Sequence, residues 1–172
     1  DRVDVLALRL PGVFTLGLFA ACPTAITAAE NKAPAPPKGK VAFRQHVINA
    51  DSKYEGAGAL DVNHDDKLDI LCGSYWYEAP TWKKHFVRDV KPADGYFLDF
   101  CELPMDVDGD GWTDVIRCAW HNKRIIWVRN PGPDRQEGKA WEEITIDEPG
   151  NMATAMLADI NGDGKPDLLP NV

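Results

Sequence analysis

Three nine-residue stretches hold eleven of the nineteen aspartates in this chain, and this concentration constrains the fold more than any other feature. The stretches cover residues 61–69, 106–114 and 159–167. Each has Asp at positions 1, 5 and 9, Asp or Asn at position 3, and Gly or Asp at position 6. Carboxylates at this density repel one another unless a cation neutralises them. A hard divalent cation takes roughly six to eight oxygen ligands, which a curled backbone with acidic side chains at alternate positions can supply.

The stretches therefore predict three calcium (Ca²⁺) sites. We expect positions 1, 3, 5 and 9 to give side-chain oxygens, and position 7 to give its backbone carbonyl, because Lys and Trp side chains cannot ligate calcium. Position 6 needs a positive φ, which Gly adopts readily and Asp tolerates. Asp66 at this position leaves the occupancy of the first site open. The predicted ligands are Asp61, Asn63, Asp65, Lys67 and Asp69; Asp106, Asp108, Asp110, Trp112 and Asp114; and Asp159, Asn161, Asp163, Lys165 and Asp167.

Other calcium motifs do not fit these stretches. An EF-hand needs a bidentate Glu at position 12 and a helix on each side. Position 12 here is Cys72, Arg117 or Pro170, and the flanking sequences are typical of strands. The helical repeats of dockerins also want an acidic residue or Asn near that position. Asp/Gly-rich turns without an ion are the remaining alternative, and three complete matches favour calcium.

The stretches also mark a repeat, because they recur at spacings of 45 and 53 residues. An aromatic residue before a short alternating segment recurs with them, at residues 43–48, 82–87 and 141–146. We expect further strands at residues 58–60, 100–105 and 155–158, and a hairpin at Asn122 and Lys123. About four short strands per repeat are typical of a β-propeller blade. The sequence therefore predicts an all-β fold with about three blades of an incomplete ring, since closure takes roughly four to eight.

The acidic stretches resemble the FG-GAP/VCBS repeat family, whose calcium loops lie between two strands of a propeller blade, as in integrin α-subunits. Residues 56–60 are similar to the Gly-Ala element of that family, whereas residues 100–104 and 154–158 lack it, which favours the VCBS type. The resemblance covers roughly residues 41–172. It implies a calcium-binding β-propeller, and we interpret the chain as the N-terminal part of a ring of about seven blades.

Residues 1–29 have the features of a signal peptide: Arg2 and Arg9 precede an apolar run that ends in small residues up to Ala29. Residues 30–40 form a Pro-rich linker. The apolar run is short and broken by Pro and Gly, so no transmembrane anchor is expected. Lipidation of Cys22 stays open. Export to the periplasm, the cell surface or the medium agrees with weak calcium sites, which extracellular calcium can fill.

Charge and cysteines restrict the partners further. The net charge is −8, and no basic patch with interleaved aromatics is present, so nucleic acid is not an expected partner. After removal of the signal peptide, Cys72, Cys101 and Cys118 remain. Their apolar context favours buried free thiols.

We therefore predict a binding or scaffold module for a protein or carbohydrate ligand, monomeric in its complete form. Trp112 is the best candidate for ligand contact, because side chains of calcium loops are usually exposed, and His64 is expected to face solvent. No nucleophile elbow, phosphate loop or dinucleotide fingerprint is present, so no catalytic residue is assigned. The alternative is an enzyme. Residues 76–80 with Trp82 and His85 resemble propellers of the aldos-2-ulose dehydratase type, a class of carbohydrate-active lyases and dehydratases, and a propeller appended to a separate catalytic domain also stays open.

Overall fold

The computed structural model describes residues 45–171. The predicted signal peptide, the linker and Phe43 therefore lie outside the described residues. All the described strands belong to one compact unit, which includes residues 48–171. Within residues 45–171 no helix is long and apolar enough to cross a bilayer.

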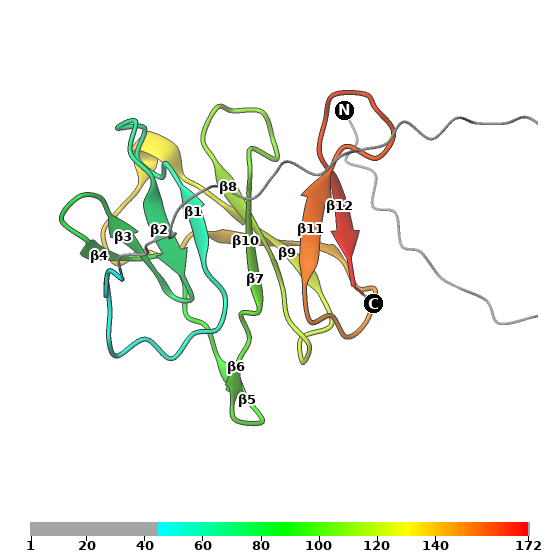
Figure 1. Cartoon of the computed structure of the whole chain (residues 1–172), viewed down its shortest axis with the longest axis horizontal. Coiled ribbons are helices and arrows are strands. Elements are labelled where there is room, and N and C mark those ends of the chain that lie inside the picture. Colours follow the sequence, from blue (N-terminus) through cyan, green and yellow to red (C-terminus); the bar gives the residue numbers. More distant parts are fainter. Residues whose placement is uncertain (1–44, 172) are drawn as a thin grey trace, which may run out of the picture. The chain divides into compact units, whose positions relative to one another are not determined.

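Two four-stranded antiparallel sheets and a two-stranded hairpin follow one another along the chain (Figure 1). In both sheets each strand pairs with the next one in sequence, and the prediction of an all-β fold is confirmed. The first sheet contains β1 (Gly58–Leu60), β2 (Asp69–Cys72), β3 (Tyr75–Glu78) and β4 (Lys83–Phe86). The second contains β7 (Cys101–Met105), β8 (Asp114–Cys118), β9 (Ile125–Arg129) and β10 (Glu142–Asp147). The hairpin pairs β11 (Ala155–Ala158) with β12 (Asp167–Pro170), β5 (Pro92–Ala93) pairs with β6 (Tyr96–Phe97), and a short 3-10 helix, η1, spans Gly132–Asp134.

The strands expected before the acidic stretches are present as β1, β7 and β11. The recurring aromatic motif belongs to the edge strands, since Trp82 and Trp141 directly precede β4 and β10. The first copy of that motif was predicted to be a strand too, and over residues 45–48 this is wrong, because they carry no strand. The two edge strands pair with β3 and β9, and residues 45–48 lack such a partner among the described strands.

Apolar side chains of consecutive sheets form two core clusters. One joins the first sheet to the second, and the other joins the second sheet to the β11–β12 hairpin. Strand β8 is buried along its whole length, with Val115 in the first cluster and Ile116 in the other. Burial of one such side chain contributes about 1.5–3 kcal/mol. The second sheet is therefore packed on both faces, as a sheet within a stack must be.

The first strands of the two sheets and of the β11–β12 hairpin are neighbours: β1 lies beside β7, and β7 beside β11. Gly58 makes the first of these contacts possible, because a Cβ there would lie 2.9 Å from the Glu102 carbonyl oxygen. At Gly56 it would lie 3.0 Å from the Asp99 carbonyl oxygen. The glycines of the Gly-Ala element are thus required sterically, because β1 and β7 pack closely against each other. Residues 45–171 form an open succession of sheets, without a closed ring.

A buried ionic cluster joins the first two sheets at the end of the strands away from the acidic stretches. Arg117 Nη2 lies 2.9 Å from Glu102 Oε1 and donates to the Gly73 carbonyl at 2.9 Å. The Gly73 N–H donates to Glu102 Oε1 at 2.8 Å, and Asp99 Oδ1 lies 3.7 Å from Arg117 Nη1. Burial raises the pKa of Glu102 well above its usual range.

Candidate metal centre

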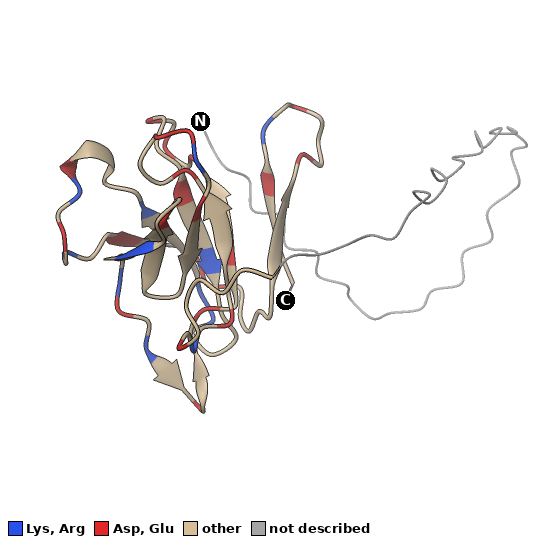
Figure 2. Cartoon of the chain, turned by 60° about the vertical axis from the view of Figure 1, so that its left-hand side comes forward, with Lys and Arg blue, Asp and Glu red and all other residues tan. Residues whose placement is uncertain are grey.

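The three acidic stretches occupy equivalent places in the fold. Loop 1 (residues 61–68) connects β1 to β2, loop 2 (106–113) connects β7 to β8, and loop 3 (159–166) connects β11 to β12. In each case the residue before position 1 pairs with the Asp at position 9: Leu60 with Asp69, Met105 with Asp114, and Ala158 with Asp167. The three loops lie at the same end of their strand pairs (Figure 1), and Figure 2 colours the ribbon red at Asp and Glu positions.

Two positions in each loop take the left-handed backbone conformation. Position 6 does so as predicted, at Asp66 with φ 63°, and at both equivalent glycines. Position 4 does so as well, at His64, Gly109 and Gly162. Sequence reasoning missed this second turn, although Gly at position 4 in two of the three stretches was the signal. The two left-handed residues in each loop curl the backbone between the strands.

The carboxylate at position 1 organises each loop by accepting backbone N–H groups. In loop 1, Asp61 accepts from Asp65 at 3.1 Å and from Asp66 at 2.9 Å. In loop 2, Asp106 accepts from Gly109 and Gly111. Asp159 in loop 3 accepts from the same positions, and from position 5. In all three loops, therefore, the carboxylate expected to ligate calcium accepts the N–H of position 6.

Position 9 lies at the base of each loop. Asp69 and Asp114 are fully buried, and Asp167 nearly so. One oxygen of each accepts the N–H of position 2, at 2.8–3.1 Å. The other oxygen of Asp69 accepts from Ala79, and that of Asp114 from Asn130, so each ties its loop to the end of the third strand. Burial raises the pKa of both Asp69 and Asp114.

The carboxylates converge most closely in loop 2. Ligand atoms of Asp106, Asp108 and Asp114 all lie within 4.8 Å of one another. Arg129 Nη2 contacts this group, 2.7 Å from Asp108 Oδ2 and 3.6 Å from Asp110 Oδ2. Three clustered carboxylates fit a hard cation, which prefers oxygen ligands. The arginine lies against the oxygens that the ion would use.

Loops 1 and 3 differ from loop 2 in their contacts. In loop 1, Lys67 Nζ lies 2.7 Å from Asp65 Oδ2, and this hydrogen bond lowers the pKa of Asp65. The amide oxygen of Asn63, at position 3, is buried and has no hydrogen-bond partner, as expected of an oxygen placed for a cation. In loop 3, Asn161 Nδ2 donates to Asp163 at 3.4 Å. At position 7, Lys67, Trp112 and Lys165 donate their N–H to position 5, and the predicted role of their carbonyls stays a prediction.

Trp112 is not the exposed side chain that the sequence analysis expected. Its indole is half-buried and stacks on His64, with ring centroids 4.0 Å apart and an interplanar angle of 7°. Gly132 packs against the same ring, where a Cβ would lie 2.9 Å from Nε1. His64 is exposed as predicted, but its contact with Trp112 connects loop 1 to loop 2. The exposure prediction failed because Trp112 lies opposite a neighbouring loop.

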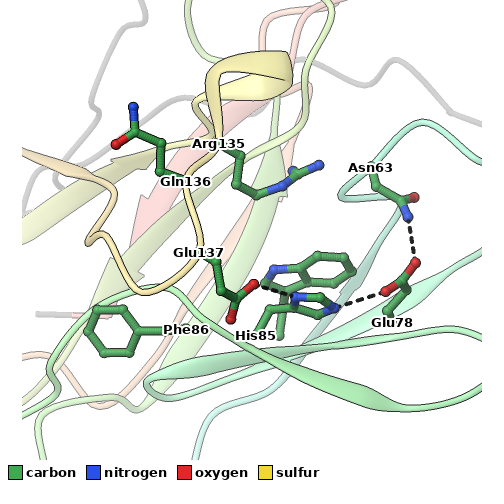
Figure 3. Close-up of a pocket in the computed structure, with 8 residues that line it drawn as sticks. Asn63, Glu78, His85, Phe86, Arg135, Gln136 and Glu137 are labelled. Atoms are coloured by element: carbon green, nitrogen blue, oxygen red, sulfur yellow. Dashed lines mark hydrogen bonds and ion pairs between the residues drawn. The ribbon is translucent and has the colours of Figure 1, made fainter.

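A cavity of about 280 Å³ lies beside loop 1 (Figure 3). His85 lies between two carboxylates, with Nε2 2.9 Å from Glu78 Oε2 and Nδ1 3.1 Å from Glu137 Oε2. Asn63 Nδ2 lies 3.4 Å from Glu78 Oε1, so this series of contacts connects loop 1 to the cavity. The lining residues are Asn63, Trp76, Glu78, His85, Phe86, Arg135, Gln136 and Glu137.

Comparison with known families supports this repeat structure. Residues 106–169 match the family model described as the FG-GAP-like repeat. This part of the chain is similar to an FG-GAP-like repeat. The matched segment begins at position 1 of loop 2 and ends in β12, so the match takes in loops 2 and 3 and all the strands between them. No curated protein and no solved structure matched the chain.

Proposed function

We propose that this protein is an exported, calcium-binding β-propeller module that binds a protein or carbohydrate ligand. One observation carries the proposal: three loops with the same ladder register and the same pair of left-handed residues place acidic side chains at equivalent positions. A bound calcium ion would neutralise these carboxylates and fix the loop. In loop 2, Asp106, Asp108 and Asp114 would hold it, and Arg129 would move away.

Exposed apolar side chains in the β11–β12 hairpin and its loop support the propeller arrangement. The apolar residue at position 2 is fully buried in loop 1, as Val62, and packs against the second core cluster in loop 2, as Val107. The equivalent Ile160 in loop 3 is 50% exposed, and Met156 on the preceding strand is 57% exposed. This apolar face has the composition of one that packs on a further sheet of the same kind.

The ligand surface is expected at the loop end of the sheets. The cavity beside loop 1 brings two carboxylates, an imidazole and a guanidinium together over a buried Trp76. Asn63 belongs both to the predicted calcium ligands and to the cavity lining, so an ion in loop 1 would orient part of the ligand surface. The match of residues 106–169 to the FG-GAP-like repeat supports the proposed export, because such repeats are typical of extracellular domains.

Equilibrium dialysis against calcium tests the metal sites directly. We expect about three ions per chain, all removed by a chelator. Asp108→Ala should remove one ion, because this carboxylate belongs to the cluster in loop 2. Lys165→Ala is the matched control and should bind the wild-type number, because position 7 would give only its carbonyl. A chain that binds no calcium would end this proposal.

A further inference from the structure

Cys101 and Cys118 lie directly opposite each other at one end of the second sheet. They are the terminal pair of the β7–β8 ladder, and loop 2 closes the other end of that ladder. Their Sγ atoms are 2.7 Å apart, closer than two unbonded sulfur atoms can pack. Paired residues in antiparallel strands have Cα atoms about 4.5–5.5 Å apart, which lies within the range of about 4.4–6.8 Å found for disulfides. The backbone therefore needs no rearrangement to accept a covalent bond.

We propose that Cys101 and Cys118 are a redox-sensitive pair that forms a cross-strand disulfide, with a small-molecule disulfide as the oxidant. This bond would close the ladder end opposite the calcium loop. The β7–β8 hairpin would then be held by a covalent bond at one end and by an ion at the other.

The surroundings of the pair suit a structural bond. Both residues belong to the core cluster between the second sheet and the β11–β12 hairpin, with Met152 and Leu168 in the same cluster. Cys101 is 8% exposed and Cys118 is 1% exposed, so a soluble disulfide or reductant reaches the pair during folding or unfolding and has poor access once the sheets have packed. Cys72 lies in the first sheet, and its Sγ is 3.6 Å from Ser52 Oγ, away from this pair.

The chemistry assigns different roles to the two thiols. The hydrogen bond between them lowers the pKa of Cys101 and raises that of Cys118. Cys101 is therefore the attacking thiolate. With oxidised glutathione, Cys101 Sγ attacks one sulfur of the oxidant, forms a mixed disulfide and releases one glutathione thiolate. Cys118 gives its proton to that thiolate and attacks Cys101 Sγ, and the second glutathione leaves as a thiolate that takes up the proton which Cys101 gave to the solvent. The two thiols are oxidised, and one glutathione disulfide is reduced to two thiols.

Peptide mapping after refolding in a mixture of reduced and oxidised glutathione tests the proposal. Trypsin cuts after Arg88, Arg117 and Lys123, so Cys101 falls in the peptide of residues 89–117 and Cys118 in that of residues 118–123. We expect these two peptides to be recovered joined, with the mass of two hydrogen atoms missing, and to separate on reduction. Recovery of both peptides with free, alkylated thiols from folded protein would overturn the proposal, and so would a link from either cysteine to Cys72.

Two variants separate a specific bond from general oxidation. Cys72→Ser is the matched control and should keep the linked peptides. The double variant Cys101→Ala/Cys118→Ala should lose them, and its thermal midpoint should no longer fall when dithiothreitol is added, whereas the wild type and Cys72→Ser should unfold at lower temperature under reduction. If the double variant fails to fold, peptide mapping of wild-type protein still decides between bond and free thiols.

Discussion

The interface between the first and second sheets is stabilised by different kinds of contact at its two ends. At the loop end, the contacts are the stack of His64 on Trp112 and the hydrogen bonds from Asn130 and Arg135 to the Val62 carbonyl, at 3.1 Å each. At the opposite end, Arg117 pairs with Glu102 and lies near Asp99, all nearly inaccessible to solvent. The buried end depends only on the packing of the sheets. The loop end depends on the conformation of loops 1 and 2, and hence on an ion if calcium fills the proposed sites.

The largest effect is expected from breaking the buried end. Arg117→Ala leaves the Asp99 carboxyl without its cation and Glu102 Oε1 without the guanidinium that it contacts, and removal of one partner of a buried ion pair costs about 3–5 kcal/mol. Urea denaturation measures the free energy of unfolding. Arg124→Ala is a suitable control, because Arg124 is exposed and should change stability by less than about 0.5 kcal/mol. Equal effects of the two variants would show that the buried cluster does not stabilise the interface.

Calcium should strengthen the loop end by a smaller amount. If each site has a Kd of about 0.1 mM, then calcium at about 1 mM adds about 1.4 kcal/mol per site. Thermal unfolding with and without a chelator measures this increment. The increment should persist in an Arg117 variant that still folds, such as Arg117→Lys, because that residue lies at the other end. An unchanged melting curve on chelation would mean that the loops hold their conformation without ions.

The contribution of the buried end to the free energy of unfolding should also depend on pH, in a direction set by Glu102. The pKa of this carboxyl is raised in the folded state by burial, so the folded protein binds its proton more tightly than the unfolded chain does. Its contribution to stability is therefore fully present below the unfolded pKa of about 4.3, and is lost as the pH rises towards the folded value. Glu102→Gln should flatten this pH dependence, because the amide does not titrate. Unfolding measured over a pH series in chelator tests it, and an identical slope in the variant would argue against the assignment.

The smallest expected effect belongs to the stack between loops 1 and 2. His64→Asn removes the imidazole but keeps a residue that tolerates the φ of 58° at this position. Loss of the aromatic contact should cost roughly 0.5–1 kcal/mol. The calcium increment should also fall, because an ion in loop 1 would no longer support loop 2. Urea titrations at two calcium concentrations separate the two effects, and an unchanged increment would show that the loops act independently.

The loops and their flanking strands could be predicted because their signal is local. Acidic residues at alternate positions and a Gly or Asp at position 6 specify the curl within nine residues, and β1, β7 and β11 lie where this pattern placed them. The contacts between sheets could not be predicted in this way, since they join residues far apart in sequence. Arg117, a charged residue within an apolar strand, was the one sign of the buried cluster. The proximity of Cys101 to Cys118 depends on ladder register, which the sequence leaves open.

Arg129 would affect the order in which the loops bind calcium. Its guanidinium forms an ion pair with Asp108, so a calcium ion in the proposed site of loop 2 would have to compete with it for this carboxylate. The arginine is 43% exposed, and an ion pair of that exposure is worth roughly 0.2–1 kcal/mol, which lowers the apparent calcium affinity by at most about fivefold. Among the described residues no cationic side chain forms an ion pair with loop 3. With otherwise equal ligands, rising calcium would therefore load loop 3 before loop 2, so that saturation spreads over a range of concentrations in place of a single threshold.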